Sequence, residues 1–509
     1  MKKILMFILI SFPVLLFAQK KNKTAEKYAN TISATDLKER LYIVASEENA
    51  GRDTPSPGLE KAAAYIETSF QSFGLQPGNG TGYRLSYPLY RDSMISTGMK
   101  INGKEYELNK DFQPQSSINY SASMAFSEAV FVGYGIVEGE RDDYKSADVH
   151  GKLVLILDGT PEGYKSSQQG FRSPSGFFGK MNTAAKKGAA AVIVITANYP
   201  RPSMNERVQW NLNGYTPSVS PLIFTASQDV ASAIMGDEGK DILSAMKKED
   251  GLPLKTYPVS INLSYWKTTT TGYAADILGT IEGTDKKDEW VIVTAHYDHV
   301  GTRNGKIYYG ADDDGSGTVS VLEIARAFAK AKAEGKGPRR SMLFMTVSGE
   351  EHGLWGSAYY ANHPVYPLDK TSADLNIDMI GRVGSEYQNS KDSSNYVYII
   401  GDDKLSSDLN PITEQVNKTY AKMILDRKYN DPKDPNRFYY RSDHFNFAEK
   451  GVPVIFYFNG THKDYHQPTD TPDKINYSLM EKRARLVFYT AWEIANRDDM
   501  LKRDIPLTK

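Results

Sequence analysis

Residues 290–298, WVIVTAHYD, decide the fold class of this 509-residue chain. Residues 290–295 form a short apolar run that predicts a buried β-strand, and His296 and Asp298 follow it directly. Residues 318–331 then show the three- and four-residue spacing of a helix. Strands that alternate with helices favour a mostly parallel sheet flanked by helices. This part of the sequence therefore predicts an α/β fold.

Several strand ends in the same part of the chain run into polar side chains. Further strands are predicted at residues 341–347, 375–377, 396–400 and 453–458. Groups that can bind a metal or exchange protons follow four of the strands, at residues 296–298, 350–351, 378 and 462–466. Ligands of open α/β sheets bind beyond the carboxyl ends of the strands. We therefore expect these side chains to meet at one edge of the sheet.

The composition limits the classes of function. Lys and Arg number 61 against 62 Asp and Glu, a formal net charge of −1, which excludes the basic footprint of a nucleic-acid-binding protein. With 40% hydrophobic and 24% charged residues, the chain has an ordinary globular composition. It contains no cysteine, so any metal must be held by histidines and carboxylates. Seven of the eight histidines lie at or after His296.

The first residues are typical of a secretory leader. Lys2 and Lys3 precede an apolar stretch at 4–17, and a small residue, Ala18, follows. The alternative is an uncleaved membrane anchor, but a span needs about 20 apolar residues, and Ser11 and Pro13 interrupt this stretch. We expect residues 1–18 to be removed, leaving an exported periplasmic or secreted protein without a membrane span.

Between the leader and the α/β segment, two patterns follow each other. Residues 32–73 predict two helices separated by the turn-rich stretch 51–58. The sequence pattern then changes to short predicted β-strands at 129–136, 153–158, 191–195 and 222–224, with one alanine-rich predicted helix at 182–187. His150 is the only histidine in this block, which favours a structural or binding role. The predicted boundaries are 25–115 and 263–509 for the catalytic domain and 116–262 for an inserted β-rich domain.

Each polar motif also has an ordinary structural explanation. A single His-x-Asp is usually a surface pair, and Glu-Glu is common on solvated helices. Asp312, Asp313 and Asp314 could compensate the dipole of the following helix, an effect of about 0.3–1 kcal/mol per charge. Capping needs only one carboxylate, however, and three in a row repel one another. Taken together, the motifs favour a cation.

Five motifs in this order resemble those of the zinc-dependent exopeptidases that include aminopeptidase Y, bacterial aminopeptidase S and the glutamate carboxypeptidases. They are AHYD at 295–298, GADDDGSG at 310–317, SGEEHGL at 348–354, NIDM at 376–379 and DYH at 464–466. The resemblance implies a phosphorylase/hydrolase-like mixed sheet. VGYG at 132–135 and GAAAV at 188–192 are similar to the protease-associated domain inserted in many such enzymes.

The resemblance also implies two Zn²⁺ ions. His296 and Asp378 match the ligands of one zinc, Glu351 and His466 match those of the other, and Asp313 matches the bridge. Two cations about 3.5 to 4 Å apart need an anionic bridge, and a carboxylate has an oxygen for each. Three carboxylates and a bridging hydroxide would balance the charge of two Zn²⁺ ions.

Four further residues match positions with other roles in the family. Glu350 resembles the general base, and Asp298 resembles the carboxylate that orients His296 through its second ring nitrogen. Tyr465 is similar to a phenol donor to the tetrahedral oxyanion, and Arg441 to a substrate-contacting arginine. Four other histidines of this part are expected to be structural or to line the site: His299, His352, His444 and His462.

The expected function is therefore that of an exported di-zinc aminopeptidase. It would hydrolyse peptides or dipeptides through a zinc-bridging hydroxide, with a glutamate as base. The alternatives are a carboxypeptidase or dipeptidase on the same scaffold, a single-zinc glutaminyl cyclase, and a binding protein without activity. Inactive members of the family lack ligands, whereas every ligand position matches here.

Overall fold

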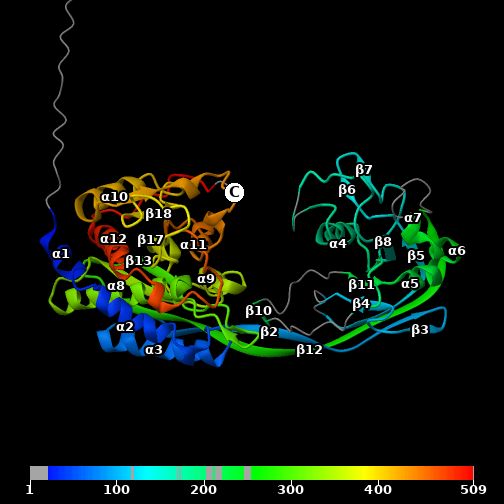
Figure 1. Cartoon of the computed structure of the whole chain (residues 1–509), viewed down its shortest axis with the longest axis horizontal. Coiled ribbons are helices and arrows are strands. Elements are labelled where there is room, and N and C mark those ends of the chain that lie inside the picture. Colours follow the sequence, from blue (N-terminus) through cyan, green and yellow to red (C-terminus); the bar gives the residue numbers. More distant parts are fainter. Residues whose placement is uncertain are drawn as a thin grey trace, which may run out of the picture. The chain divides into compact units, whose positions relative to one another are not determined.

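The computed structural model describes residues 21–115, 118, 120–168, 170, 173–201, 210–212, 221–245 and 254–507. The chain forms two compact units (Figure 1). The discontinuous unit comprises Met1–Tyr87 and Tyr273–Lys509, and the inserted unit comprises Pro88–Gly272. The predicted leader 1–18 and the predicted domain boundary at Ser116 lie outside the described residues. Among the residues that are described, no helix is long and apolar enough to cross a membrane.

The sheet of the discontinuous unit has the strand order β19-β18-β20-β17-β13-β16-β12. Its strands are β13 (Lys286–His296), β16 (Arg340–Val347), β17 (Thr371–Ile377), β18 (Tyr396–Ile400), β19 (Ile424–Asp426), β20 (Val454–Phe458) and the end of β12 (Thr256–Ile281). β13 runs parallel to β16 and β17, and β17 runs parallel to β20, whereas β12 and β18 are antiparallel to their neighbours β16 and β20. The mostly parallel mixed sheet predicted from the sequence is confirmed.

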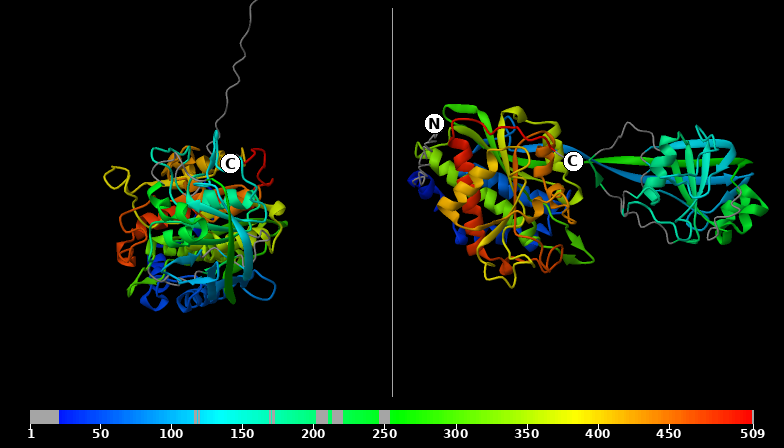
Figure 2. Two further views of the ribbon diagram at one scale, coloured as in Figure 1. Left: turned by 90° about the vertical axis from the view of Figure 1, so that its right-hand side faces the viewer. Right: turned by 90° about the horizontal axis from the view of Figure 1, so that it is seen from above.

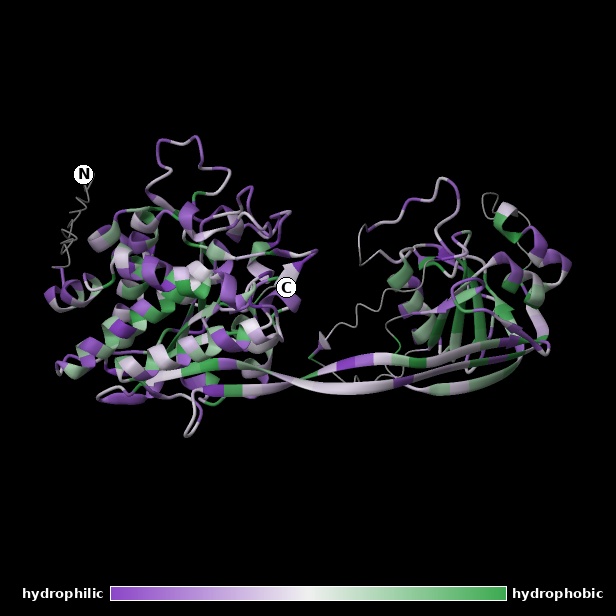
Figure 3. Cartoon of the chain, turned by 60° about the horizontal axis from the view of Figure 1, so that its bottom comes forward, coloured by the Kyte–Doolittle hydropathy of each residue, from purple (hydrophilic) through white to green (hydrophobic). Residues whose placement is uncertain are grey.

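Burial on both faces explains the apolar runs of these strands. Every residue of β16, β17, β18 and β20 is buried. Parallel strands with covered faces are near-continuous in hydrophobicity, which is the pattern of β20, whereas β17 also buries polar residues such as Asp374 and Asn376. In Figure 3 the apolar residues are concentrated in the strands of each unit and in the helices beside them.

Helices flank this sheet. α8 (Gly317–Ala333) and α12 (Tyr477–Asn496) pack on each other and on β13, β16 and β17, while α11 (His444–Glu449) packs on β17, β20 and α9 (Trp355–Asn362) (Figure 2). The other helices are α1 (Lys23–Ala29), α2 (Ala34–Val44), α3 (Pro57–Phe73) and α10 (Leu409–Val416). The predicted helix at 318–331 is confirmed as α8, and the predicted pair within 32–73 as α2 and α3.

The ends of α3 follow directly from its sequence. The Ser56 side chain accepts a hydrogen bond from the Leu59 N–H, and Pro57 occupies the first turn, where its missing N–H costs nothing. Gly74 ends the helix with a φ of 83°, a left-handed conformation that favours glycine. Short additional strands of this unit are β1 (Gln76–Pro77), β14 (Thr302–Arg303) and β15 (Lys306–Ile307).

The inserted unit contains a second set of mostly parallel strands, which belongs to the same continuous sheet through the pairing of β12 with β5. β5 (Ala122–Phe131), β8 (Leu153–Leu157), β9 (Ala191–Ile195) and β11 (Leu222–Ala226) are parallel neighbours in that order, and β4 (Phe112–Pro114) is antiparallel to β11. The remaining elements are β3 (Lys104–Tyr106), β6 (Val137–Glu138), β7 (Arg141–Asp142), β10 (Trp210–Asn211), α4 (Phe177–Lys186), α5 (Gln228–Met235), α6 (Asp237–Lys240) and α7 (Ile242–Ala245).

The strand predicted at 129–136 is too long at its carboxyl end. β5 stops at Phe131 because Gly133 and Gly135 adopt φ values of 71° and 69°, which turn the chain. The helix predicted at 182–187 begins earlier, at Phe177.

The chain passes between the two units in two long strands, β2 (Arg84–Ile101) and β12. In β12, residues 256–265 alternate between buried and exposed, whereas residues 274–281 are buried throughout. The first part therefore has one covered face and the second part has two. The sequence analysis did not predict either strand as one element, because such a change of period hides its continuity.

Candidate metal centre

The candidate site lies where the parallel strands β13, β16, β17 and β20 end. Their carboxyl ends share one edge of the sheet, and α8 starts at that edge. Gly349, with a φ of 74°, turns the chain after β16 so that two glutamates follow. The predicted site residues reach the edge from five segments: His296, Asp313, Glu350 with Glu351, Asp378, and His466.

The first group of side chains surrounds the Nε2 atom of His296. This atom lies 3.3 Å from Asp313 Oδ1, 3.8 Å from Asp378 Oδ1 and 3.9 Å from Glu350 Oε2. His296 is 1% exposed, so the group is removed from solvent. A histidine nitrogen and several carboxylate oxygens that converge in this way could hold a metal ion.

A second group lies on the other side of Asp313. His466 Nε2 is 3.0 Å from Asp313 Oδ2 and 3.0 Å from Glu351 Oε2. His299 Nδ1 is 2.7 Å from Glu351 Oε1 and 3.8 Å from Asp313 Oδ2. Asp313 therefore directs one oxygen to each group. His299 belongs to the second group by position, although the sequence analysis placed it outside the ligand set.

Buried polar atoms without a hydrogen-bond partner mark both groups. Among the described residues these atoms include His296 Nε2, Asp313 Oδ2, Glu351 Oε1 and both ring nitrogens of His299. Several of these atoms lie close to an oppositely charged group, such as His299 Nδ1 at 2.7 Å from Glu351 Oε1, yet they make no hydrogen bond, which nearly all buried polar groups in proteins do. Nitrogen and carboxylate oxygen are the donors that Zn²⁺ prefers when no thiolate is present. The arrangement fits one cation on each side of Asp313.

Only the middle residue of the three consecutive aspartates faces these groups. Asp312 Oδ2 lies 3.0 Å from His462 Nε2, and Asp314 accepts hydrogen bonds from the N–H groups of Gly317 and Met379, both at 2.9 Å. The sequence suggested that a run of three is easier to understand beside a cation, and by position only Asp313 can serve such a cation. The outer two carboxylates fix the loop.

Asp298 links the first group to the glutamate turn. The Nδ1 atom of His296 lies 3.2 Å from the Asp298 carbonyl oxygen and 3.5 Å from its carboxylate. The same carboxylate accepts a hydrogen bond from the Glu350 N–H at 3.2 Å. Asp298 is fully buried, and both its backbone and its side chain face the site.

The pKa values of the two adjacent glutamates are shifted in opposite directions. Burial raises the pKa of Glu350 well above its usual value, and the charges of Asp378 and Glu351 add to this effect while His296 opposes it. Burial acts in the same direction on Glu351, but the neighbouring His299 and His466 outweigh it and lower its pKa to about 2. Glu350 therefore holds a proton readily, whereas Glu351 stays an anion.

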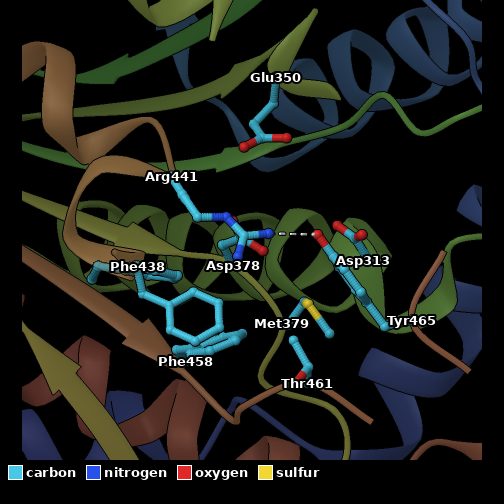
Figure 4. Close-up of a pocket in the computed structure, with 10 residues that line it drawn as sticks. Asp313, Glu350, Asp378, Met379, Phe438, Arg441, Phe458, Thr461 and Tyr465 are labelled. Atoms are coloured by element: carbon cyan, nitrogen blue, oxygen red, sulfur yellow. Dashed lines mark hydrogen bonds between the residues drawn. The ribbon is translucent and has the colours of Figure 1, made fainter. Parts of the chain in front are cut away.

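A pocket opens beside the first group (Figure 4). The Arg441 guanidinium lies over the Phe438 ring, 4.9 Å from its centroid, and donates a hydrogen bond of 3.3 Å to the Tyr465 hydroxyl. The lining residues are Asp313, Glu350, Asp378, Met379, Phe438, Arg441, Phe456, Phe458, Thr461 and Tyr465.

The sequence analysis missed the apolar wall of this pocket. Phe456 and Phe458 alternate along β20, so they lie on one face of that strand. The spacing of two between Phe456 and Phe458 was the sequence signal that could have predicted this apolar wall. Met379 comes from the loop after Asp378, and Phe438 from the turn Phe438–Tyr440.

Comparisons with known proteins show what the part of the chain that carries this centre is similar to. Residues 276–491 match Peptidase family M28. The chain is 27% identical over 390 residues to a probable glutamate carboxypeptidase of Zea mays, covering 69% of this chain and 50% of that protein. It is 25% identical over 373 residues to the aminopeptidase YwaD of Bacillus subtilis, covering 71% of this chain and 66% of that protein. The chain thus spans between half and two thirds of these relatives.

A solved structure shares the fold. The aminopeptidase from Aneurinibacillus sp. strain AM-1 aligns with a TM-score of 0.54 and 20% identity over 95% of this chain and 100% of its own. The resemblance to zinc-dependent exopeptidases drawn from the five motifs is confirmed at the level of the family.

Proposed function

We propose, on the premise that residues 276–491 match Peptidase family M28, that the protein is an exported di-zinc metallo-aminopeptidase. One observation carries the proposal. Asp313 directs its two oxygens to two separate groups of histidine and carboxylate atoms. A single-zinc glutaminyl cyclase would need only one of these groups.

We assign the ligands as the motif series implies. His296 and Asp378 hold one zinc, Glu351 and His466 hold the other, and Asp313 lies between them. Three carboxylates offset most of the charge of two Zn²⁺ ions. When bound, the ions would polarise the scissile carbonyl and lower the pKa of water at the centre.

Glu350 carries the proton from the attacking water to the leaving amine. Its carboxylate lies on the pocket wall beside His296, and its raised pKa suits a group that takes up a proton from water and later gives one to the leaving amine. The Tyr465 hydroxyl accepts a hydrogen bond from Arg441, so its own proton is available for the carbonyl oxygen of a substrate. Asp298 keeps the His296 ring in place from behind.

The charge balance favours a free amino terminus. Once the zinc charges are neutralised, the ionised form of Glu350, which is the form that accepts the proton of water, would leave about one negative charge next to the scissile bond, and this charge would attract an ammonium group. Arg441 supports the second candidate, a carboxypeptidase or dipeptidase, because its guanidinium lies on the same pocket wall and can bind a carboxylate. The two candidates differ in the end of the peptide that they need.

Matched dipeptides separate these candidates. The same dipeptide is assayed free, N-acetylated and C-amidated with zinc-loaded protein. We expect acetylation to lower kcat/KM more than amidation does. Rapid cleavage of the acetylated peptide together with refusal of the amidated one would replace the aminopeptidase by the carboxypeptidase. A cyclised product from an N-terminal glutamine, with one zinc per chain, would support the cyclase.

Export follows from the leader-like residues 1–18. Mass spectrometry of the protein recovered from a periplasmic extract tests it. A mature chain that begins near Gln19 is expected, and an intact Met1 in the cytoplasmic fraction would contradict it.

A further inference from the structure

A short loop of the N-terminal segment, residues 51–54, contacts three of the loops that carry candidate ligands. The Gly301 N–H donates to the Gly51 carbonyl at 3.0 Å, and the His299 N–H donates to the Arg52 carbonyl at 3.2 Å. The Gly349 N–H, just before the two glutamates, donates to the Thr54 hydroxyl at 3.1 Å. The third loop, which leads to Asp313, is reached by the Arg52 side chain.

The Arg52 guanidinium is fully buried and donates only to backbone carbonyls. Its Nε donates to Tyr297 at 2.7 Å, between His296 and Asp298. Nη1 donates to Tyr309 at 2.8 Å, and Nη2 donates to Gly310 at 2.9 Å, three residues before Asp313. Nη1 also donates a hydrogen bond of 3.0 Å to the carbonyl of Val44, the last residue of α2, so the guanidinium is bound to that helix as well. One rigid group thus spans the His296 loop and the Asp313 loop.

The backbone of the loop is adapted to this position. Gly51 has a φ of 77°, and a Cβ atom there would lie 2.5 Å from the carbonyl oxygens of Gly301 and Tyr308. Arg52 has a φ of 51°, in the left-handed region that is unfavourable for residues with a Cβ. A glycine would adopt this conformation without strain, so the arginine is retained for its side chain.

The charge of Arg52 also suits its surroundings. Burial lowers its pKa to about 10, and the nearby carboxylates of Asp298, Asp313, Asp314 and Asp470 oppose this shift. The guanidinium is therefore charged at neutral pH. A buried positive charge next to several acids stabilises them before any cation binds.

We propose that Arg52 is a positioning residue of the metal centre, whose fork holds the His296 loop and the Asp313 loop at the separation that the ligands need. This inference rests on the proposed function, because it assumes that these residues bind zinc. The simpler alternative is that Arg52 only fastens the N-terminal segment to the fold. The two explanations differ in whether zinc affinity depends on the guanidinium.

A second buried arginine provides the matched control. Arg340 is also fully buried and donates to the backbone carbonyls of Ile494, Arg497 and Asp498, and to the Glu289 carboxylate at 2.7 Å. Among the contacts of its side chain, none is to a candidate ligand or to a neighbour of one. Its loss should weaken the fold without changing the metal centre.

The experiment compares the full chain with Arg52→Lys, Arg52→Gln and Arg340→Lys. Zinc affinity is measured by competition with a fluorescent chelator, and the unfolding midpoint is measured in EDTA. We expect about 10- to 100-fold weaker zinc binding in both Arg52 variants, the range for residues that orient ligands. Lysine keeps the charge but cannot span both loops. In Arg340→Lys we expect a lower midpoint and zinc affinity within threefold of wild type.

Folded Arg52 variants with wild-type zinc affinity would overturn the inference. If the Arg52 variants do not fold, Thr54→Val provides the decisive measurement, because it removes only the acceptor of the Gly349 N–H. Zinc affinity several-fold weaker than wild type supports the positioning role of the loop, and unchanged affinity refutes it. Failure of wild-type protein to bind zinc would instead refute the proposed function.

Discussion

The two units each contain a buried parallel sheet, yet only one of them ends in reactive side chains. In the discontinuous unit, β13 ends in a histidine, and acids follow β16 and β17. In the inserted unit, β5 is followed by Val132 and Gly133, and β8 by Asp158 and Gly159. Every residue of β8 and β9 in the inserted unit is buried, as is every residue of β16 and β17 in the discontinuous unit.

The difference lies in how the polar atoms at the strand ends are satisfied. The Asp158 carboxylate accepts a hydrogen bond of 2.9 Å from the Gly159 N–H in its own turn. His296 Nε2 and Asp313 Oδ2, in contrast, are buried without a hydrogen-bond partner. A parallel sheet thus supplies a suitable edge, but chemistry requires polar groups that the protein itself leaves unsatisfied.

Removal of the central carboxylate should have the largest effect. We expect Asp313→Ala to lose zinc from both groups and to lose activity, because its two oxygens face both. His466→Ala should chiefly empty one group. Asp158→Ala, at a strand end of the inserted unit, should change neither quantity. Atomic absorption on dialysed protein tests this, and equal zinc content in wild type and Asp313→Ala would refute the bridging assignment.

Replacement of the proposed base should have a smaller effect. Glu350→Gln should retain both zincs and lose about 10²- to 10⁴-fold in kcat, the range for general acid-base catalysis. Glu138→Gln is the control in the inserted unit, where that carboxylate accepts hydrogen bonds from Tyr164 and Ser167. Its kcat should equal that of wild type. Full activity of Glu350→Gln at normal metal content would remove Glu350 from this role.

A buried histidine should make the discontinuous unit sensitive to acid. His444 is fully buried between the rings of Phe456 and Tyr439, and burial lowers its pKa to about 3. The folded protein thus keeps the ring neutral, whereas the unfolded chain protonates it near pH 6.5. Its contribution to stability is complete above about pH 6.5 and is lost as the pH falls from there towards 3.

The free energy of unfolding is expected to fall by about 2 kcal/mol between pH 7 and pH 5 because of His444. Urea unfolding in EDTA of wild type and His444→Leu measures it, since the loss of stability should be smaller by that amount in the variant. The histidine of the inserted unit, His150, is exposed, so His150→Leu should show the wild-type loss. Parallel pH dependence in wild type and His444→Leu would contradict the prediction.

The sequence analysis succeeded where chemistry and periodicity coincide. His296 ends one buried strand, and Asp378 directly follows another. These two positions are enough to predict that both residues lie at the same edge of the sheet. The helix α8 was equally clear, because its apolar face has a single period. β12 was not, since it is covered on one face in its first part and on two in its second.

Residues that act through three-dimensional proximity alone could not be predicted. His299 is three positions from His296, and nothing in that spacing shows that its ring faces Glu351. The Phe438 side chain joins the pocket from a turn far along the chain. The position of Arg52 was even harder to predict from the sequence. Its partners are backbone carbonyls, which every residue has, so the sequence pattern does not indicate them.

The division of the discontinuous unit around residues 88–272 has a consequence for the order of synthesis. At about 5–20 residues per second, a ribosome needs roughly 10 to 40 seconds to make the inserted part. During this time Arg52 has emerged, but Tyr297 and Gly310, whose carbonyls it binds, have not yet been translated. The inserted unit is contiguous and can fold first. The N-terminal helices can therefore complete their contacts only when the carboxyl-terminal half has been made, and the metal centre cannot form before His466 is available.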